Sequence, residues 1–311
     1  MTAVGRRPSP QAPRCSDVSL ELGESMVATA SPARTWLLVE QPGPWGRRLP
    51  EQSHLPRPLA TRLTEIVRQV GVRLVLIRRH GRAEPRERHV FAASSGVEAS
   101  WLAHASLRDI GALAELDLAP LGSGERPDFL DPDPDPLFLV CTNGRRDRCC
   151  AERGRPVART LQRSEPERTW ECSHIGGDRF AGNVVCLPHG LFFGRMGAED
   201  AGDVAARYRR GEIDLAHFRG RSALGFVIQA AEAHLRRQHA LTRVDDLRFL
   251  GRRQEDGDVV TTFEGPGGAV FEARVRIGRA ESARRLTCQV AEVARPPTFH
   301  VTERGSPSGA F

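Results

Sequence analysis

Cysteine and histidine, the side chains that bind transition metals and iron–sulfur clusters, gather in one part of this chain. Five of the seven cysteines fall between residues 137 and 196. Cys141 and Cys150 have eight residues between them, and His174 precedes Asp178 by the short spacer Ile-Gly-Gly. Thiolate, imidazole and carboxylate together form a common donor set for a transition metal. These residue types and spacings indicate a metal centre.

The surrounding sequence predicts elements that would bring these four side chains together. Hydrophobic patterning favours strands at 137–140, 169–172, 183–187 and 191–195, and helices at 151–162 and 198–209. Parallel strands joined by a right-handed crossover end at one edge of a sheet. Cys141, the start of the first helix and the loop after the second strand would therefore converge. The order β-α-β-β-β-α is that of a thioredoxin-like unit.

Two segments in this block, CTNGRRDRCC at 141–150 and HIGGDRFAGN at 174–183, resemble the sucrase/ferredoxin-like family. The family is a branch of the thioredoxin-like ferredoxins. The resemblance extends over roughly 30–300 and includes TWLLVEQPGPWG and FRGRSAL. Fungal members hold a [2Fe–2S] cluster through two cysteines with eight residues between them and an H-x-G-G-H motif. The resemblance implies that Cys141 and Cys150 bind one iron and His174 the other.

The second histidine of that motif is Asp178 here, so the identity of the fourth ligand stays open among Asp178, Cys172 and Cys149. Asp178 is the preferred choice, and the C-x8-C spacing favours Cys150 over Cys149 as the second thiolate. We expect the Gly176-Gly177 pair to let backbone N–H groups approach the cofactor closely. Arg148 and Arg179 are expected to offset the negative charge of the cofactor and its thiolates.

Two alternatives to an iron–sulfur protein in electron transfer or redox sensing follow from the same residues. A mononuclear zinc site with a structural or interaction role would accept Asp178 without difficulty. A thiol oxidoreductase could use Cys149 or Cys150 near a helix N-terminus, although the usual C-x-x-C spacing is absent. We expect an electron-transfer protein rather than an enzyme, with a reductase or acceptor protein as its redox partner.

The sequence predicts an α/β protein with five segments. They are a disordered tail at 1–30, a second thioredoxin-like α/β half at 31–119, a Pro/Asp linker at 120–136, the thioredoxin-like ferredoxin domain at 137–240 and a β-rich region at 241–311. The first half has the predicted order β-α-β-β-α, with its last helix at 107–116. Strands are predicted at 259–263, 269–277, 286–293 and 298–301.

The remaining cysteines and His189 receive structural interpretations. Cys15 lies near the predicted tail and is interpreted as a bystander. Cys186 and Cys288 fall in predicted strands, where cysteine behaves as a small core residue. The alternative for Cys288 is a further ligand brought over the cluster. His189 is expected to be exposed in a hairpin turn, and Arg219 in FRGRSAL to lie at a surface junction.

The composition is that of an ordinary globular protein, with 27% charged residues and 40% hydrophobic ones. All 45 basic residues are arginine, which we interpret as the codon usage of a GC-rich genome, such as that of an actinobacterium. The net charge of +6 comes with no nucleic-acid-binding motif, so we expect no nucleic-acid partner. No apolar run is long enough to span a membrane, and a cytoplasmic protein is expected.

Overall fold

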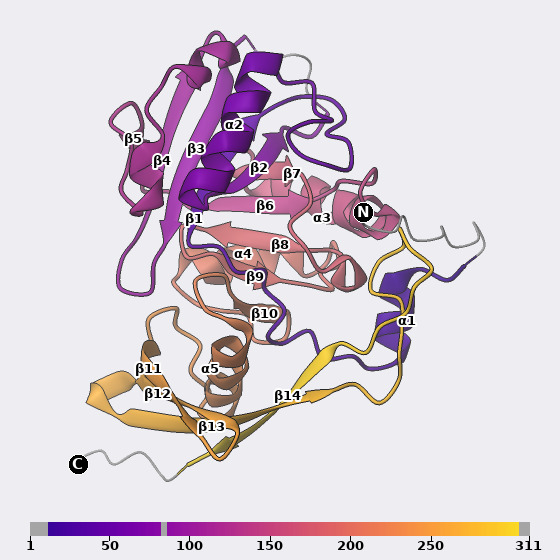
Figure 1. Cartoon of the computed structure of the whole chain (residues 1–311), viewed down its shortest axis with the longest axis vertical. Coiled ribbons are helices and arrows are strands. Elements are labelled where there is room, and N and C mark those ends of the chain that lie inside the picture. Colours follow the sequence, from indigo (N-terminus) through magenta and orange to yellow (C-terminus); the bar gives the residue numbers. More distant parts are fainter. Residues whose placement is uncertain (1–11, 82–85, 305–311) are drawn as a thin grey trace.

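A computed structural model of the chain describes residues 12–81 and 86–304 (Figure 1). Ten strands form one large curled sheet in the order β10-β9-β8-β6-β7-β2-β1-β3-β4-β5. Their bounds are β1 Thr35–Glu40, β2 Arg73–Arg78, β3 Arg88–Ser95, β4 Ser100–Leu107, β5 Asp131–Pro132, β6 Leu137–Cys141, β7 Thr169–Cys172, β8 Val184–Leu187, β9 Leu191–Phe193 and β10 Phe218–Arg221. The helices are α1 Cys15–Glu21, α2 Arg57–Val70, α3 Arg148–Ser164, α4 Ala201–Arg209 and α5 Phe226–Gln238. Short 3₁₀ helices are η1 Ile110–Ala114, η2 Ala119–Gly122, η3 Asp178–Phe180 and η4 Pro266–Gly268.

The large sheet contains the same strand arrangement twice. In the first half β1 pairs in parallel with β2, while β3 is antiparallel to β1 and β4 to β3. In the second half β6 pairs in parallel with β7, while β8 is antiparallel to β6 and β9 to β8. Antiparallel pairing of β2 with β7 joins the halves. The predicted α/β class is confirmed, and each half is consistent with a thioredoxin-like arrangement.

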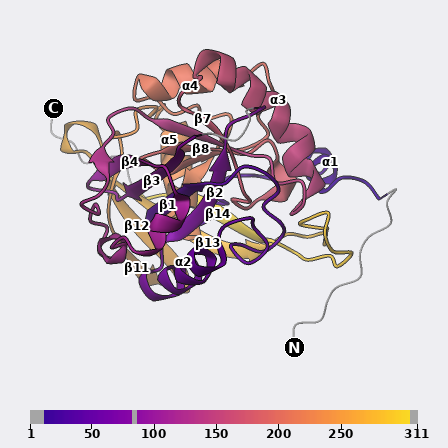
Figure 2. The ribbon, with the colours of Figure 1, turned by 90° about the horizontal axis from the view of Figure 1, so that it is seen from above.

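Side chains alternate between the two faces of each strand. One face of each half contributes to a shared inner core, and the opposite face of each half packs against helices. Trp36 and Leu38 of β1 share the inner core with Leu139 and Cys141 of β6. The outer residues of β1 pack under α2, and those of β6 pack under α3 and α4. Figure 2 shows α2 on one side of the molecule and α3 with α4 on the other. The inner faces of both halves thus form one continuous core, which includes Cys141.

A second, four-stranded antiparallel sheet follows in the order β11-β12-β13-β14. Its strands are β11 Arg248–Glu255, β12 Asp258–Glu264, β13 Val270–Arg279 and β14 Pro297–Glu303. They pack against α5 through a separate apolar core. The predicted β-rich character of this region is confirmed. The strand predicted at 286–293 is wrong, because in 280–296 the structure describes a single bridge, Arg284 with Ala294, and no strand.

Several predicted boundaries need correction. Helix α3 begins at Arg148 rather than Ala151, because the side chain of Asp147 accepts a hydrogen bond from the backbone N–H of Cys149 at 2.9 Å and caps the helix. Pro156 therefore lies inside the helix. The helix predicted at 107–116 is only the short η1, and the preceding residues form β4, which was not predicted.

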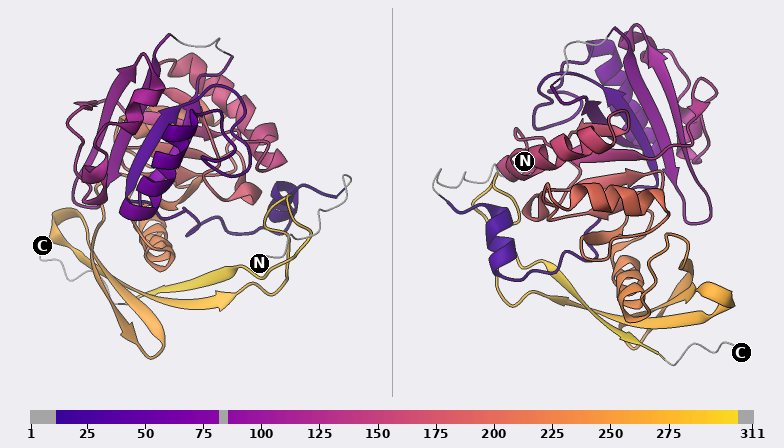
Figure 3. Two further views of the ribbon diagram at one scale, coloured as in Figure 1. Left: turned by 45° about the horizontal axis from the view of Figure 1, so that its top comes forward. Right: turned by 180° about the vertical axis from the view of Figure 1, so that it is seen from behind.

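The N-terminal segment also differs from its prediction as a disordered tail up to residue 30. Residues 15–21 form α1, which lies beside the loop between β13 and β14 (Figures 1 and 3). Residues 1–11 are outside the described part of the chain. In the predicted linker, Asp131–Pro132 pairs with β4 as an extended edge strand, and Leu130 is buried. Among the described residues, no helix is both long and apolar enough to cross a membrane.

Candidate metal centre

Three of the predicted ligands meet at one end of the sheet. Cys141 is the last residue of β6, Cys150 lies in the first turn of α3, and His174 follows β7 in the loop that leads to η3. One sulfur or nitrogen atom from each lies within 4.8 Å of the others. Both thiols are 1% exposed, whereas the His174 side chain is 21% exposed. The parallel β6-α3-β7 crossover therefore brings the three donors together as predicted from sequence.

Asp178 lies beside this group. Its Oδ1 is 3.3 Å from the Cys150 sulfur and 3.0 Å from Nδ1 of His174. Although close to Asp178, this buried Nδ1 has no hydrogen bond of good geometry within the described chain. A buried nitrogen without an aligned partner suits a metal ligand. Asp178 is thus placed to act as a ligand or to orient His174.

The other two candidates for the fourth ligand are less well placed. Cys172 is the parallel neighbour of Cys141 across the β6–β7 pair and is fully buried, but its sulfur is not part of the close group. Cys149 directs its sulfur to Cys15 and Cys288 instead. Geometry therefore favours Asp178 among the three. Because Cys149 and Cys150 are both buried, neither presents a thiol to a substrate as an oxidoreductase would.

The side chains of the site influence each other's protonation in the metal-free protein. A hydrogen bond from the Cys150 thiol, together with His174, holds the pKa of Cys141 well below its usual value. Burial acts to lower the pKa of His174, but the adjacent Asp178 and Cys141 outweigh it and raise the pKa to about 9. Burial likewise opposes ionisation of Asp178, yet His174 keeps its pKa below the ordinary value. The site therefore favours a thiolate, which is the form that binds a metal.

Gly176 and Gly177 shape the loop after His174, with φ of 95° and 79°. A Cβ atom on Gly177 would collide with the guanidinium of Arg219, and one on Gly176 with the hydroxyl of Ser31. The pair was predicted to approach a cofactor. The structure shows that it also allows this loop to pack directly on Arg219.

The two arginines predicted to offset the charge of the site are engaged elsewhere. The Arg148 side chain is 55% exposed and lies 3.6 Å from Glu152 on the next turn of α3. Arg179 donates a hydrogen bond to Glu24 at 3.0 Å and lies over the ring of Phe180. Each side chain thus pairs with a carboxylate outside the predicted ligand group.

Arg219 is the buried cation that the sequence-based prediction placed at the surface. It is fully buried and donates hydrogen bonds to the Thr29 carbonyl at 2.6 Å and the Asn183 side chain at 2.8 Å. Burial lowers its pKa to about 9, against the nearby charges of Asp178 and Cys141. The position of Arg219 in FRGRSAL, one of the segments that carry the family resemblance, was the only feature of the sequence that set this arginine apart.

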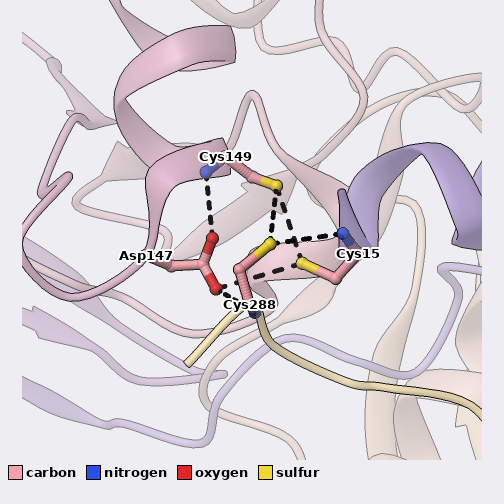
Figure 4. Close-up of side chains that lie close together, drawn as sticks. All are labelled: Cys15, Asp147, Cys149 and Cys288. Carbon is pink, nitrogen blue, oxygen red and sulfur yellow. Dashed lines mark hydrogen bonds between the residues drawn. The ribbon is translucent and has the colours of Figure 1, made fainter. Parts of the chain in front are cut away.

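A second group of potential ligands lies on the other side of the α3 N-terminus (Figure 4). It consists of Cys15, Asp147, Cys149 and Cys288, with one ligand atom of each within 4.8 Å of the others. Cys15 and Cys149 are fully buried, and hydrogen bonds from Cys15 and Cys288 lower the pKa of Cys149. Cys288 lies outside the strands of the described chain, contrary to its prediction, and Cys15 is buried in this group rather than lying in a disordered tail.

Comparison with known proteins supports the sequence resemblance. No solved structure is significantly similar to the chain. The chain is 32% identical over 97 residues to "Altered inheritance of mitochondria protein 32" of the yeast Meyerozyma guilliermondii, a match that covers 28% of this chain and 34% of the yeast protein. The chain thus spans about a third of that relative's length.

The family comparison covers the metal-binding block and most of the large sheet. The matched region, 26–220, includes Cys141, Cys150, His174 and Asp178, but it ends before α5 and the second sheet. The family match therefore ends at residue 220, whereas the sequence resemblance was inferred to extend to about residue 300. Because more than half of the chain matches this model, the protein belongs to the sucrase/ferredoxin-like family.

Proposed function

We propose that the protein binds a [2Fe–2S] cluster through Cys141, Cys150 and His174, with Asp178 as the fourth ligand, and acts in electron transfer or redox sensing. The observation that carries this proposal is the convergence of two buried thiols and one imidazole within 4.8 Å at the end of the sheet. The family match over the same residues supports it. Two cysteines and a histidine are ligands found in clusters of Rieske type.

The residues present fit such a group. Both thiols are buried, and Nδ1 of His174 has no aligned hydrogen-bond partner among the residues that the structure describes. The buried guanidinium of Arg219 adds positive charge close to Asp178 and Cys150, which would offset bound thiolates. Arg73, also close to Cys141, donates a long hydrogen bond of 3.5 Å to the carbonyl of His174. When bound, the cluster would supply reversible one-electron exchange.

His174 is the most exposed of the three close donors. Its side chain is 21% accessible, compared with 1% for each of the two thiols. A redox partner docking over this loop would therefore approach the site most closely at His174. We propose a partner protein, either a reductase or an acceptor, and a reducing compartment such as the cytoplasm, in which the seven free cysteines would stay reduced.

One observation favours a second candidate function, a mononuclear zinc site. All three donor atoms lie close enough to surround a single ion. Ligands on the two irons of a sulfide-bridged cluster lie farther apart than ligands of one ion. Cysteine, histidine and aspartate are also a common donor set for zinc. The two candidates differ in colour and redox activity, because zinc has no redox chemistry.

The test is a set of single variants purified without oxygen. We expect Cys141→Ser, Cys150→Ser and His174→Ala to lose most of the bound iron and the visible absorption that dithionite bleaches. Cys186→Ala is the matched control, because Cys186 is a buried cysteine of β8 outside both ligand groups, and it should keep both signals. Iron retained in all three site variants would contradict the proposal, and a colourless wild-type protein with zinc at this site would establish the zinc alternative.

A further inference from the structure

Three cysteines from distant parts of the chain meet around the N-terminus of α3 (Figure 4). The sulfur of Cys149 is 3.6 Å from that of Cys15 and 3.5 Å from that of Cys288. A tetrahedral zinc ion with Zn–S bonds of about 2.3 Å separates its sulfur ligands by about 3.8 Å. The observed separations are close to that edge length, so only a small outward shift would let one ion occupy the centre.

Neither a disulfide nor an ordinary apolar core explains this group equally well. The sulfurs lie well beyond the bond length of about 2.05 Å of a disulfide, and a single bond would leave the third thiol without a role. The apolar cluster here consists of Cys15, Cys149 and Ala181 with Cys288 at its edge, and it contains no large side chain. Such a small core contributes little hydrophobic stabilisation, whereas three thiolates can hold a metal ion tightly.

Asp147 supplies the fourth donor and is already held in place. It is fully buried, and its Oδ1 accepts the hydrogen bond that caps α3. Its Oδ2 accepts hydrogen bonds from the Thr287 hydroxyl at 2.7 Å and the Cys288 backbone N–H at 2.6 Å, and it lies 3.9 Å from the Cys15 sulfur. Hydrogen bonds to a carboxylate ligand fix its orientation, as is usual in metal sites.

The segments that carry Cys15 and Cys288 contain little regular structure and are held largely by polar contacts, such as those of Arg195 with Ser19 and Arg284 with Glu24. Helix α1 has only seven residues, fewer than an isolated helix needs, and Leu20 on it is 62% exposed. Residues 280–296 contain one isolated bridge and no strand. Ion pairs of Arg14 with Glu152 and Arg153 with Asp17 connect α1 to α3, but they are partly exposed and therefore weak.

We propose that Cys15, Cys149, Cys288 and Asp147 bind one zinc ion, which fastens α1 and the β13–β14 loop to the N-terminus of α3. Its three thiolates and one carboxylate complete a four-coordinate structural site with no position left for a substrate. Binding displaces the thiol protons to solvent. The site stands independently of the proposed iron–sulfur centre, because the adjacent residues Cys149 and Cys150 face different ligand groups.

The proposed zinc site lies close to the first metal centre. The Thr287 hydroxyl that bonds Asp147 also helps to lower the pKa of Asp178, so it lies close to both carboxylates. Helix α1 packs against η3, which begins at Asp178.

The test is metal analysis of the full chain, purified under reducing conditions and dialysed after incubation with Zn²⁺. We expect one zinc per chain in the wild type that disappears in Cys15→Ser/Cys288→Ser, while iron and visible absorption remain. In Cys141→Ser/Cys150→Ser the iron should be lost and the zinc kept. Cys186→Ala should keep both metals. Zinc that is absent from the wild type, or that follows Cys141 and Cys150 instead, would overturn the proposal.

Cobalt provides a readout that needs no substitution at the proposed site. Co²⁺ added to metal-free Cys141→Ser/Cys150→Ser should give the sulfur-to-cobalt charge-transfer band and the intense visible bands of tetrahedral thiolate coordination. One equivalent of Zn²⁺ should abolish them. Weak octahedral cobalt bands, or a Cys149 disulfide to Cys15 or Cys288 that persists in mass spectra after mild reduction, would contradict the assignment whether or not the Cys15→Ser/Cys288→Ser variant folds.

Discussion

Asp178 occupies the position at which the H-x-G-G-H motif carries its second histidine, and it touches both Cys150 and His174. A carboxylate in this place can bind the metal directly or hold the imidazole in position. We predict that Asp178→Ala lowers metal affinity at least about 10-fold, since even residues that only orient a ligand contribute that much. Asp178→His should retain the metal, because it restores the imidazole of the motif. Iron per chain and the visible spectrum measure both effects.

A matched control for this pair is Asp203→Ala, which removes an exposed aspartate of α4 far along the chain from the site. It should bind metal as the wild type does. If Asp178→Ala kept its full metal content through dialysis against a chelator, Asp178 would be neither a ligand nor a positioning residue. Cys172, the buried neighbour of Cys141 in β7, would then be the next candidate.

At this scale, the candidate ligands that could be predicted from the sequence are those that lie close to regular elements. Cys141, Cys150 and His174 follow from strand ends and a helix start, because a β-α-β crossover fixes where those points lie. The second cysteine group could not be predicted in this way. Cys15 and Cys288 reach Cys149 across 134 and 139 residues of sequence, and no local spacing encodes such contacts. Arg219 was missed because its partners, Thr29 and Asn183, are also distant.

At the scale of elements, the loop between β7 and η3 depends on a glycine. Gly177 has φ of 79°, and a Cβ there would enter the space of the buried Arg219 guanidinium. We predict that Gly177→Ala lowers the free energy of unfolding by roughly 2–4 kcal/mol, from left-handed strain and overpacking together. Urea denaturation of the metal-free protein measures this change.

Gly202→Ala is the corresponding control. Gly202 lies in α4, and an added Cβ would meet no atom within 4 Å. Alanine favours the helical backbone, so this variant should gain up to about 1 kcal/mol. Equal midpoints for the two variants would show that Arg219 moves aside easily and that the loop is not tightly packed.

The turn between β8 and β9 makes stability depend on pH. His189 is half-buried rather than exposed as predicted, and its Nδ1 lies within hydrogen-bond distance, 2.7 Å, of the Tyr208 hydroxyl. Burial lowers the pKa of His189 to about 4, from an ordinary value of 6.5. The unfolded chain therefore binds this proton first as the pH falls. Stability should decrease by roughly 2–3 kcal/mol between pH 6.5 and 4 and be unaffected by His189 above that range.

The contribution of His189 is isolated by comparison with His189→Gln, whose amide can still form a hydrogen bond with the Tyr208 hydroxyl. The unfolding free energies of wild type and variant should be measured from pH 7 to 4. As the pH falls, the wild type should lose more stability than the variant. A difference that stays constant over this range would mean that His189 keeps its ordinary pKa in the folded protein.

Element predictions failed where tertiary contacts decide the outcome. Helix α1 is too short to be recognised by periodicity and lies in a Pro- and Ser-rich segment. Residues 286–293 alternate like a strand but find no partner strand among the described residues. Strand β6 was predicted correctly, since its sequence LFLVC is the continuous apolar run typical of a buried parallel strand and depends little on its neighbours.

At the scale of the whole molecule, the two halves are joined at the β2–β7 pair by Glu171. This carboxylate is 3% exposed and accepts hydrogen bonds from Arg78 across the pair, at 2.7 Å, and from the Thr142 hydroxyl at 3.0 Å. His80 contributes a further contact to it. We predict that Glu171→Gln lowers the free energy of unfolding by roughly 1–3 kcal/mol, because it removes charge-assisted bonds at a buried position.

Glu272→Gln is the matched control for the junction. Glu272 also pairs with an arginine, Arg253, but on the second sheet with both side chains partly exposed. Its loss should change stability little, since water screens exposed ion pairs. If the two variants lost equal stability, the buried contacts of Glu171 would stabilise the fold no more than a partly exposed ion pair does. This junction could not be predicted from the sequence, because antiparallel edge pairing between distant strands leaves no local pattern.

The most direct test of the central claim is an iron and acid-labile sulfide assay, with a visible spectrum, on full-length protein purified without oxygen. The proposal predicts a red-brown protein with iron and sulfide in equal amounts, about two of each per chain, and broad absorption between roughly 400 and 600 nm. A protein that stays colourless after anaerobic reconstitution with iron and sulfide would contradict the assignment of Cys141, Cys150 and His174 to an iron–sulfur cluster.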